Sequence, residues 1–108
     1  MMISIQENGC RDDEVKLLDT RIPYFFEHMK YLFLQAPQDF EIVLVDSKEN
    51  FQQFKGENTQ ESAFIKNNTV YIYEPHLFGV ETKTKRKDFY RSLYQEIVYL
   101  FYRVNKAQ

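Results

Sequence analysis

The clearest periodic pattern in the chain runs through residues 87–104. Its apolar positions recur three and four residues apart, which is the spacing that places side chains on one face of an α-helix. These positions are Phe89, Leu93, Ile97, Leu100, Phe101 and Val104. Tyr90, Tyr94 and Val98 widen the apolar face to about half of the helix circumference, more than a surface helix usually shows. The pattern therefore predicts a helix that the rest of a small domain largely encloses.

A second helical pattern covers residues 12–35. The acidic run Asp12-Asp13-Glu14 suits the start of a helix. The apolar positions that follow keep the same steps of three and four, and they are Val15, Leu18, Ile22, Phe25, Met29 and Leu32. Pro23 lies inside this pattern and is expected to kink the helix or split it in two, because proline lacks a backbone donor and crowds the preceding turn. The helix is expected to end near Gln35, before Pro37.

The segment after this helix predicts a buried strand followed by a short helix. Residues 40–46 form a nearly continuous apolar run, which is typical of a strand covered on both faces. Ser47 is expected to cap a helix over residues 48–55, and Gly56 to end it.

Two further apolar runs, residues 62–66 and 69–74, flank Asn67-Asn68. Asparagine tolerates the positive φ of a tight turn, so this arrangement predicts an antiparallel hairpin. Residues 1–11 are interpreted as a loose N-terminal tail that could include a brief strand at Ile3–Ile5, and residues 12–108 as one domain. The order helix, strand, short helix, hairpin, helix predicts an α+β fold. We expect a small, mainly antiparallel three-stranded sheet with the two long helices packed on one face.

Composition narrows the setting without assigning an activity. The 108 residues carry a formal net charge of −2, so no overall field points to nucleic acid or to an anionic membrane. Cys10 is the single cysteine, which excludes an intrachain disulfide and favours a reducing compartment. The apolar start at Met1–Ile5 is too short for a signal peptide, and no stretch is long enough to span a membrane. A cytoplasmic protein without a membrane partner is expected.

Gln95-Glu96-Ile97-Val98-Tyr99 lies where a zinc peptidase helix would carry His-Glu-x-x-His, the motif that binds zinc through two imidazoles. Upstream, the hairpin with Ser62, Ala63 and Phe64 in its first strand resembles the edge-strand hairpin of gluzincin metallopeptidases. In that family an Asn-Ala-Phe-like segment pairs with the substrate backbone, and the active-site helix follows after a loop. The order of elements from about Asp12 to Arg103 is similar to that of single-domain minigluzincins.

The resemblance implies a scaffold without the peptidase chemistry. Gln95 and Tyr99 replace both imidazole ligands, and the acidic third ligand of the family has no counterpart after Tyr99. No metal or other cofactor is therefore expected. The leading hypothesis is a non-catalytic module that binds a protein or peptide, or associates with itself, through the sheet edge and a tyrosine-rich surface. The alternative is a metal-dependent hydrolase with an atypical ligand set that includes Glu96.

The remaining candidates favour simpler interpretations. Lys83, Lys85, Arg86 and Lys87 form a basic cluster that could contact nucleic acid, although such a run is more often a solvated loop. His28 and His76 are expected to be structural or solvent-facing, because nothing in their spacing requires a metal site. Cys10 lacks the local context of a nucleophile.

Overall fold

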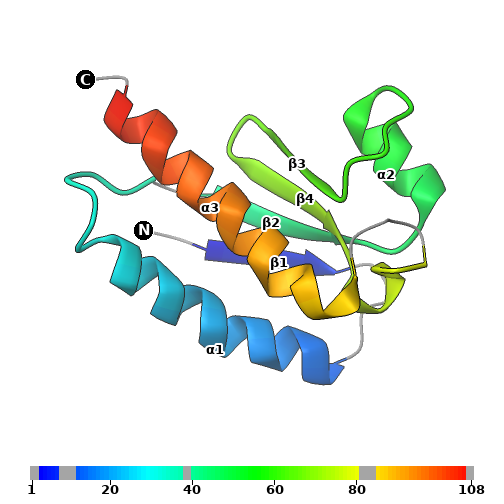
Figure 1. Ribbon diagram of the computed structural model, residues 1–108, viewed down its shortest axis with the longest axis horizontal. Helices are drawn as coiled ribbons and strands as arrows, with labels where there is room; N and C mark the ends of the chain where they lie inside the picture. Colours follow the sequence, from blue (N-terminus) through cyan, green and yellow to red (C-terminus); the bar gives the residue numbers. More distant parts are fainter. Residues whose placement is uncertain (1–2, 8–11, 38–39, 81–84, 107–108) are drawn as a thin grey trace.

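The computed structural model describes residues 3–7, 12–37, 40–80 and 85–106. Its helices and strands follow one another as β1 (Ile3–Glu7), α1 (Asp12–Met29), β2 (Phe40–Val45), α2 (Lys48–Lys55), β3 (Ala63–Lys66), β4 (Thr69–Tyr73) and α3 (Phe89–Lys106) (Figure 1). Two short 3-10 helices, Pro75–Leu77 and Arg86–Asp88, lie between β4 and α3. The predicted α+β class is confirmed. None of the helices in these ranges is long and apolar enough to cross a membrane.

The strands form one mixed sheet in the order β1-β2-β4-β3. It differs from the predicted sheet in two respects, because it has four strands and because β2 pairs in parallel with both β1 and β4. The β3–β4 hairpin supplies the antiparallel pairing. β2 thus lies between two neighbouring strands, and side chains cover both of its faces. This accounts for its nearly continuous apolar run.

β1 contains the brief strand considered at Ile3–Ile5 and extends it to Glu7, within the predicted loose tail. It pairs with β2 from Ile3 opposite Phe40 to Glu7 opposite Leu44. A parallel pair needs a long crossover between its strands, and α1 supplies it. Nothing near these residues in the sequence indicated their pairing with β2, which lies far along the chain. The rest of the predicted tail, including Cys10, lies outside the described residues.

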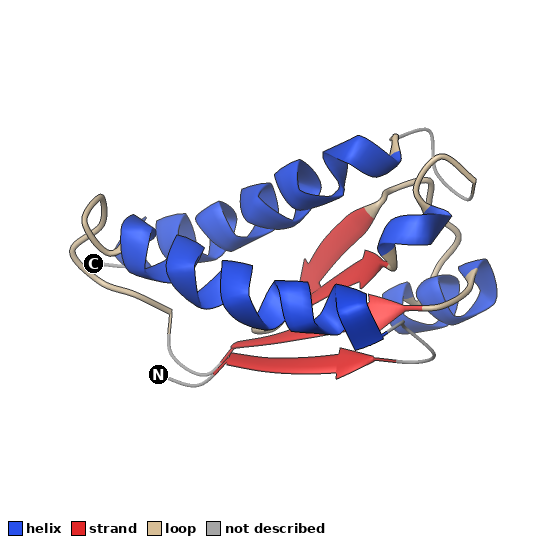
Figure 2. Cartoon of the chain, turned by 90° about the horizontal axis from the view of Figure 1, so that it is seen from below, coloured by secondary structure: helices blue, strands red, loops and turns tan. Residues whose placement is uncertain are grey.

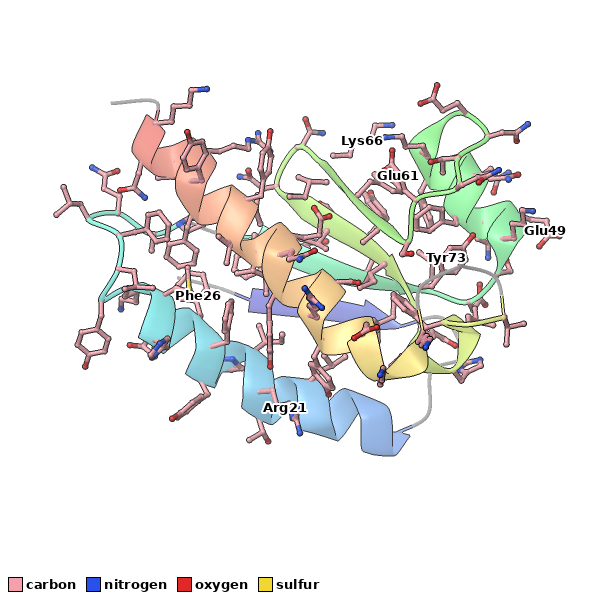
Figure 3. The ribbon with its side chains drawn as sticks, in the orientation of Figure 1. Arg21, Phe26, Glu49, Glu61, Lys66 and Tyr73 are labelled. Atoms are coloured by element: carbon pink, nitrogen blue, oxygen red, sulfur yellow. The ribbon has the colours of Figure 1, made fainter. Side chains whose placement is uncertain are left out.

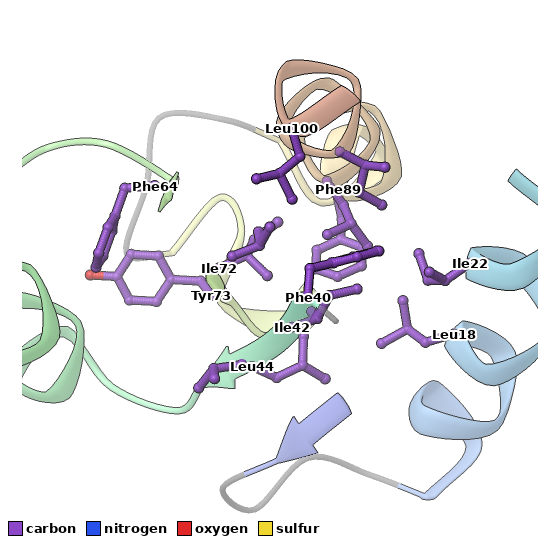
Figure 4. Packing of buried hydrophobic residues seen from close by; sticks show 14 of the residues in the cluster. Leu18, Ile22, Phe40, Ile42, Leu44, Phe64, Ile72, Tyr73, Phe89 and Leu100 are labelled. Atoms are coloured by element: carbon purple, nitrogen blue, oxygen red, sulfur yellow. The ribbon is translucent and has the colours of Figure 1, made fainter. Parts of the chain in front are cut away.

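α1 and α3 lie side by side over one face of the sheet (Figures 1 and 2). Phe26 joins the layers, because its ring stacks on Phe40 of β2 at 5.4 Å and meets Phe101 of α3 at 4.8 Å between centroids. Figure 4 shows Leu18 and Ile22 of α1 directed at β2 in the same core. The predicted buried face of α3 is confirmed at Phe89, Leu93, Ile97, Leu100 and Phe101.

α1 departs from its predicted course at two places. It continues through Pro23 without splitting, and it ends at Met29 rather than near Gln35. As a result Leu32 lies beyond the helix and is 68% exposed. The turn after α1 is held to α3 by Asn105, whose Oδ1 accepts a hydrogen bond from the Gln35 N–H at 3.0 Å and whose Nδ2 donates to the Gln35 carbonyl at 2.9 Å.

α2 lies on the face of the sheet opposite to α3. Successive residues of a strand point to opposite faces, so Tyr71 and Tyr73 face away from the core that receives Val70 and Ile72. The Phe51 ring of α2 stacks on Tyr73 at 4.2 Å. The helix has the expected caps, since the Ser47 hydroxyl accepts from the Asn50 N–H at 3.2 Å and Gly56 ends it with a φ of 85°.

Candidate functional site

β3 lies at an edge of the sheet, as was expected for the first strand of the hairpin. Within the described residues no further strand pairs with its outer side. Its register with β4 sets which backbone groups face outward. Lys66 pairs with Thr69 across the two-residue turn, and the Tyr73 N–H donates to the Ser62 carbonyl at 3.4 Å. Bonded and non-bonded pairs alternate along an antiparallel ladder. The N–H and C=O groups of Ala63 and Ile65 therefore point away from β4.

The turn that fixes this register is the one predicted from Asn67-Asn68. Asn67 has a φ of 58°, the left-handed conformation that asparagine tolerates better than most residues. β3 begins at Ala63, one residue after the predicted start at Ser62, although the Ser62 carbonyl still accepts from β4.

An aromatic cluster beneath β3 holds the strand in place. The ring of Phe64, which is buried, meets Phe51 edge-on at 5.1 Å and stacks on Tyr71 at 4.9 Å. The Lys55 Nζ lies 5.0 Å from the centroid of the Phe64 ring and 3.7 Å from Oε1 of Glu61. Glu61 precedes β3 and Lys66 is its last residue, and Figure 3 shows both beside α2. These contacts fix the side chains of β3 while its outer backbone groups stay directed outward.

α3 borders the edge on the other face of the sheet. Nη1 of Arg103 donates a hydrogen bond to the Asn67 carbonyl at 3.2 Å, which ties the helix to the hairpin turn. Glu96 lies two helical turns before Arg103 on the same side of α3. Burial raises the pKa of the Glu96 carboxyl, and the carboxylate of Glu61 raises this pKa further. Sequence reasoning did not bring Glu61 and Glu96 together, because their proximity depends on how α3 packs against the segment before β3.

Gln95, Glu96 and Tyr99, the positions compared with a zinc-binding motif, differ in exposure on α3. Glu96 is half-buried on the β3 side, whereas Gln95 and Tyr99 are exposed. Gln95 lines a hollow that is shared with Phe25 of α1, and Cζ of Arg103 lies 6.0 Å from the Tyr99 ring centroid. In the described ranges, no group of three or more His, Cys, Asp or Glu side chains is placed to hold a metal ion.

The two histidines are far from one another in the chain and lie in different elements. His28 is exposed in the last turn of α1. His76 is exposed just after β4, with its Nε2 3.4 Å from Oε2 of Glu74. Glu74 is 1% exposed and follows the carboxyl end of β4. The interpretation of both histidines as solvent-facing agrees with their exposure.

Part of the basic cluster can be placed. Lys85 and Lys87 are exposed around the 3-10 helix that precedes α3, and Arg86 begins that helix. Lys83 lies outside the described residues. The described part of the cluster thus belongs to the connection into α3 and not to the β3 edge.

Comparison of the chain with protein-family models, with curated proteins and with solved structures finds no significant match.

Proposed function

We propose that this protein is a non-catalytic module that binds an extended peptide, or an extended segment of another protein, by strand addition to β3. The observation that carries the proposal is the open side of β3, where the backbone groups of Ala63 and Ile65 point away from β4. A strand added at such an edge gains main-chain hydrogen bonds without displacing any strand of the sheet.

Preorganisation of the edge supports this function. The Phe64 side chain is locked between Phe51 and Tyr71, and Arg103 anchors the hairpin turn to α3. A partner strand would therefore dock on a backbone whose conformation is already set, and little ordering entropy would oppose binding.

The gluzincin resemblance supports the same surface. In that family the hairpin edge strand pairs with the substrate backbone beside the active-site helix. Here β3 is an edge strand antiparallel to β4, and α3 follows and lies beside it. Because Gln95 and Tyr99 stand in place of the zinc-binding imidazoles, we propose that the chain keeps peptide binding and lacks hydrolysis. The proposal retains a cytoplasmic setting, which the single Cys10 favours.

Amide hydrogen exchange tests the proposal at single residues. In the dilute protein, the amides of Ala63 and Ile65 are expected to exchange faster than those of Phe64 and Lys66, which point toward β4. Peptides selected on the full chain from a displayed library of random sequences should slow exchange at Ala63 and Ile65. In concentrated protein without peptide, the amides of Ala63 and Ile65 should still exchange fast. Slower exchange there would show that the edge pairs with a second copy of the chain instead.

A proline substitution tests the outward-facing backbone of β3 without removing a hydrogen bond to β4. Ala63→Pro removes an N–H that faces outward, and proline is tolerated at such edge positions. It should weaken binding of the selected peptides by about tenfold or more, whereas Ala63→Ser, which keeps the N–H, should bind nearly as the wild type does. Equal binding by Ala63→Pro and Ala63→Ser in folded protein would show that β3 is not the docking strand.

A further inference from the structure

A groove runs between α1 and α3 on the side away from the sheet. The two helices lie in the same direction, since Arg21 meets Tyr90, Phe25 meets Tyr94, and Phe26 meets Phe101 farther along. Two hollows lie along the groove, with volumes of about 390 Å³ and about 560 Å³. Tyr94 lines both of them, so the two hollows adjoin at its side chain.

The floor of the groove is aromatic and aliphatic. Phe25 and Tyr94 stack face to face with ring centroids 4.1 Å apart, and Val98 extends the apolar surface one turn along α3. Tyr24 stands at the α1 wall and is 79% exposed. An exposed tyrosine next to a rigid stacked pair is the type of residue that contributes strongly to protein interfaces.

Among the residues that the structure describes, the charged groups that line the two hollows are arginines. Arg21 comes from α1 (Figure 3), with its Cζ 4.5 Å from the centroid of the Tyr90 ring. Arg91 comes from α3 and lines the larger hollow. Among the described residues, no Asp or Glu lines either hollow. A chain with a formal net charge of −2 therefore has a locally cationic border around an apolar floor.

We propose that this groove docks an acidic amphipathic helix of another protein. An apolar stripe of such a helix would lie on Phe25, Tyr94 and Val98, and carboxylates beside the stripe would pair with Arg21 and Arg91. A helix fits the depression between two neighbouring helices, because its side-chain ridges pack into the grooves they leave. The planar guanidinium groups favour carboxylates, which they bind in bidentate geometry.

The charges disfavour a second copy of this chain in the groove. A two-fold dimer would bring the same patch onto both sides of the interface. Arg21 and Arg91 would then face the arginines of the other copy, and like charges across an interface suppress association. The groove is also separate from β3, because Tyr94 and Val98 face α1 whereas Arg103 faces the hairpin.

Selection of helical peptides provides the test. A displayed library of helix-forming peptides, with randomised side chains beside a fixed apolar stripe, would be selected on the folded full chain. Enriched peptides are expected to carry Asp or Glu beside the stripe. In ¹⁵N spectra they should shift the amides of Phe25, Tyr94 and Val98, and leave those of β3 unchanged.

Charge reversal within the groove supplies the decisive comparison. Arg91→Glu should weaken the enriched peptides by at least about tenfold and should itself select peptides with Lys or Arg. Lys106→Glu makes the same charge change at the other end of α3, away from the hollows, and should leave peptide binding within about twofold of the wild type.

Three results would overturn the proposal. One is a selection that returns no binders, or binders without acidic enrichment. Another is binding that maps outside the groove or responds equally to Arg91→Glu and Lys106→Glu. The third is a concentration-dependent dimer, measured by sedimentation, that Arg91→Glu alters and Lys106→Glu does not, since this would identify a second copy as the occupant.

Discussion

Among single residues, Glu96 lies in a setting that opposes its charged form. Its carboxyl is half-buried on the β3 side of α3, and Glu61 is a second acidic group nearby. Burial and this like charge both raise its pKa above the ordinary value that it has in the unfolded chain. Ionised Glu96 therefore destabilises the fold, and a residue of the same shape without the charge would not.

We predict that Glu96→Gln stabilises the protein at neutral pH. Below the ordinary pKa of glutamate the carboxyl is neutral in both folded and unfolded chains, so the variant should gain nothing there. The gain should grow as pH rises from the unfolded-state pKa through the raised folded-state pKa, and stay constant above it. Urea unfolding at a series of pH values measures it. Glu49→Gln, at an exposed position of α2, is the control. A gain at Glu96 that is the same at every pH would contradict the assignment.

The apolar face of α3 gives a prediction of larger size. Leu93 and Ile97 are both 0% exposed at the centre of this face. Truncation of either to alanine should lower the free energy of unfolding by about 2–5 kcal/mol, because the lost methyl groups leave a cavity. Tyr99→Ala removes a side chain that is 53% exposed and should cost much less. Denaturation midpoints of Leu93→Ala and wild type that coincide would refute this packing.

At the scale of elements, local signals predicted what local interactions determine. The three- and four-residue spacing identified α3 and its buried face, and Asn67-Asn68 identified the hairpin turn. The signals failed where distant parts of the chain decide. The pairing of β1 with β2 was not indicated near Ile3–Ile5, where a brief strand was considered, and the end of α1 at Met29 is accompanied by a clamp from Asn105 on α3.

The candidate sites divide in the same way. The edge position of β3 followed from the hairpin and its resemblance to a peptidase strand. The approach of Glu61 to Glu96 and the groove beside Phe25 and Tyr94 depend on how the helices pack. The sequence around these four residues carries no signal for that packing. The tyrosine-rich surface was expected from the spread of tyrosines around α3, but its cationic border from Arg21 was not.

The relation of α3 to a peptidase helix can be tested directly. As it stands the protein is predicted to show no metal-dependent peptidase activity, with or without added zinc, because Gln95 and Tyr99 supply neither imidazole. Gln95→His with Tyr99→His places two imidazoles four residues apart on exposed positions of one helix. Zinc should raise the melting temperature of this double variant by binding preferentially to the folded state.

The single variants serve as controls for that experiment, since one imidazole should give a smaller zinc effect than two. Hydrolysis is not expected to return in the double variant, because a third ligand is still missing. A folded double variant whose melting temperature does not respond to zinc at neutral pH would remove the main support for the match between the two helices.

At the scale of the whole molecule, α3 connects the two proposed binding surfaces. One side of it borders the β3 edge through Arg103, and the other borders the groove through Tyr94. Its buried face packs on the sheet between them. α3 therefore contributes to both surfaces, together with α1 at the groove and with β3 at the sheet edge, while the basic connection at Lys85 and Lys87 lies at its start.

The direction of β3 determines the direction in which a bound strand would run. A strand that joins β3 in the favoured antiparallel sense must run in the direction of β4, from the Asn67 turn toward Glu61. The site would then accept a peptide strand in one direction only. A peptide that binds should lose its affinity when its sequence is reversed at constant composition. A spin label at its amino end should broaden Lys66 and Asn67, and one at its carboxyl end Glu61 and Ser62.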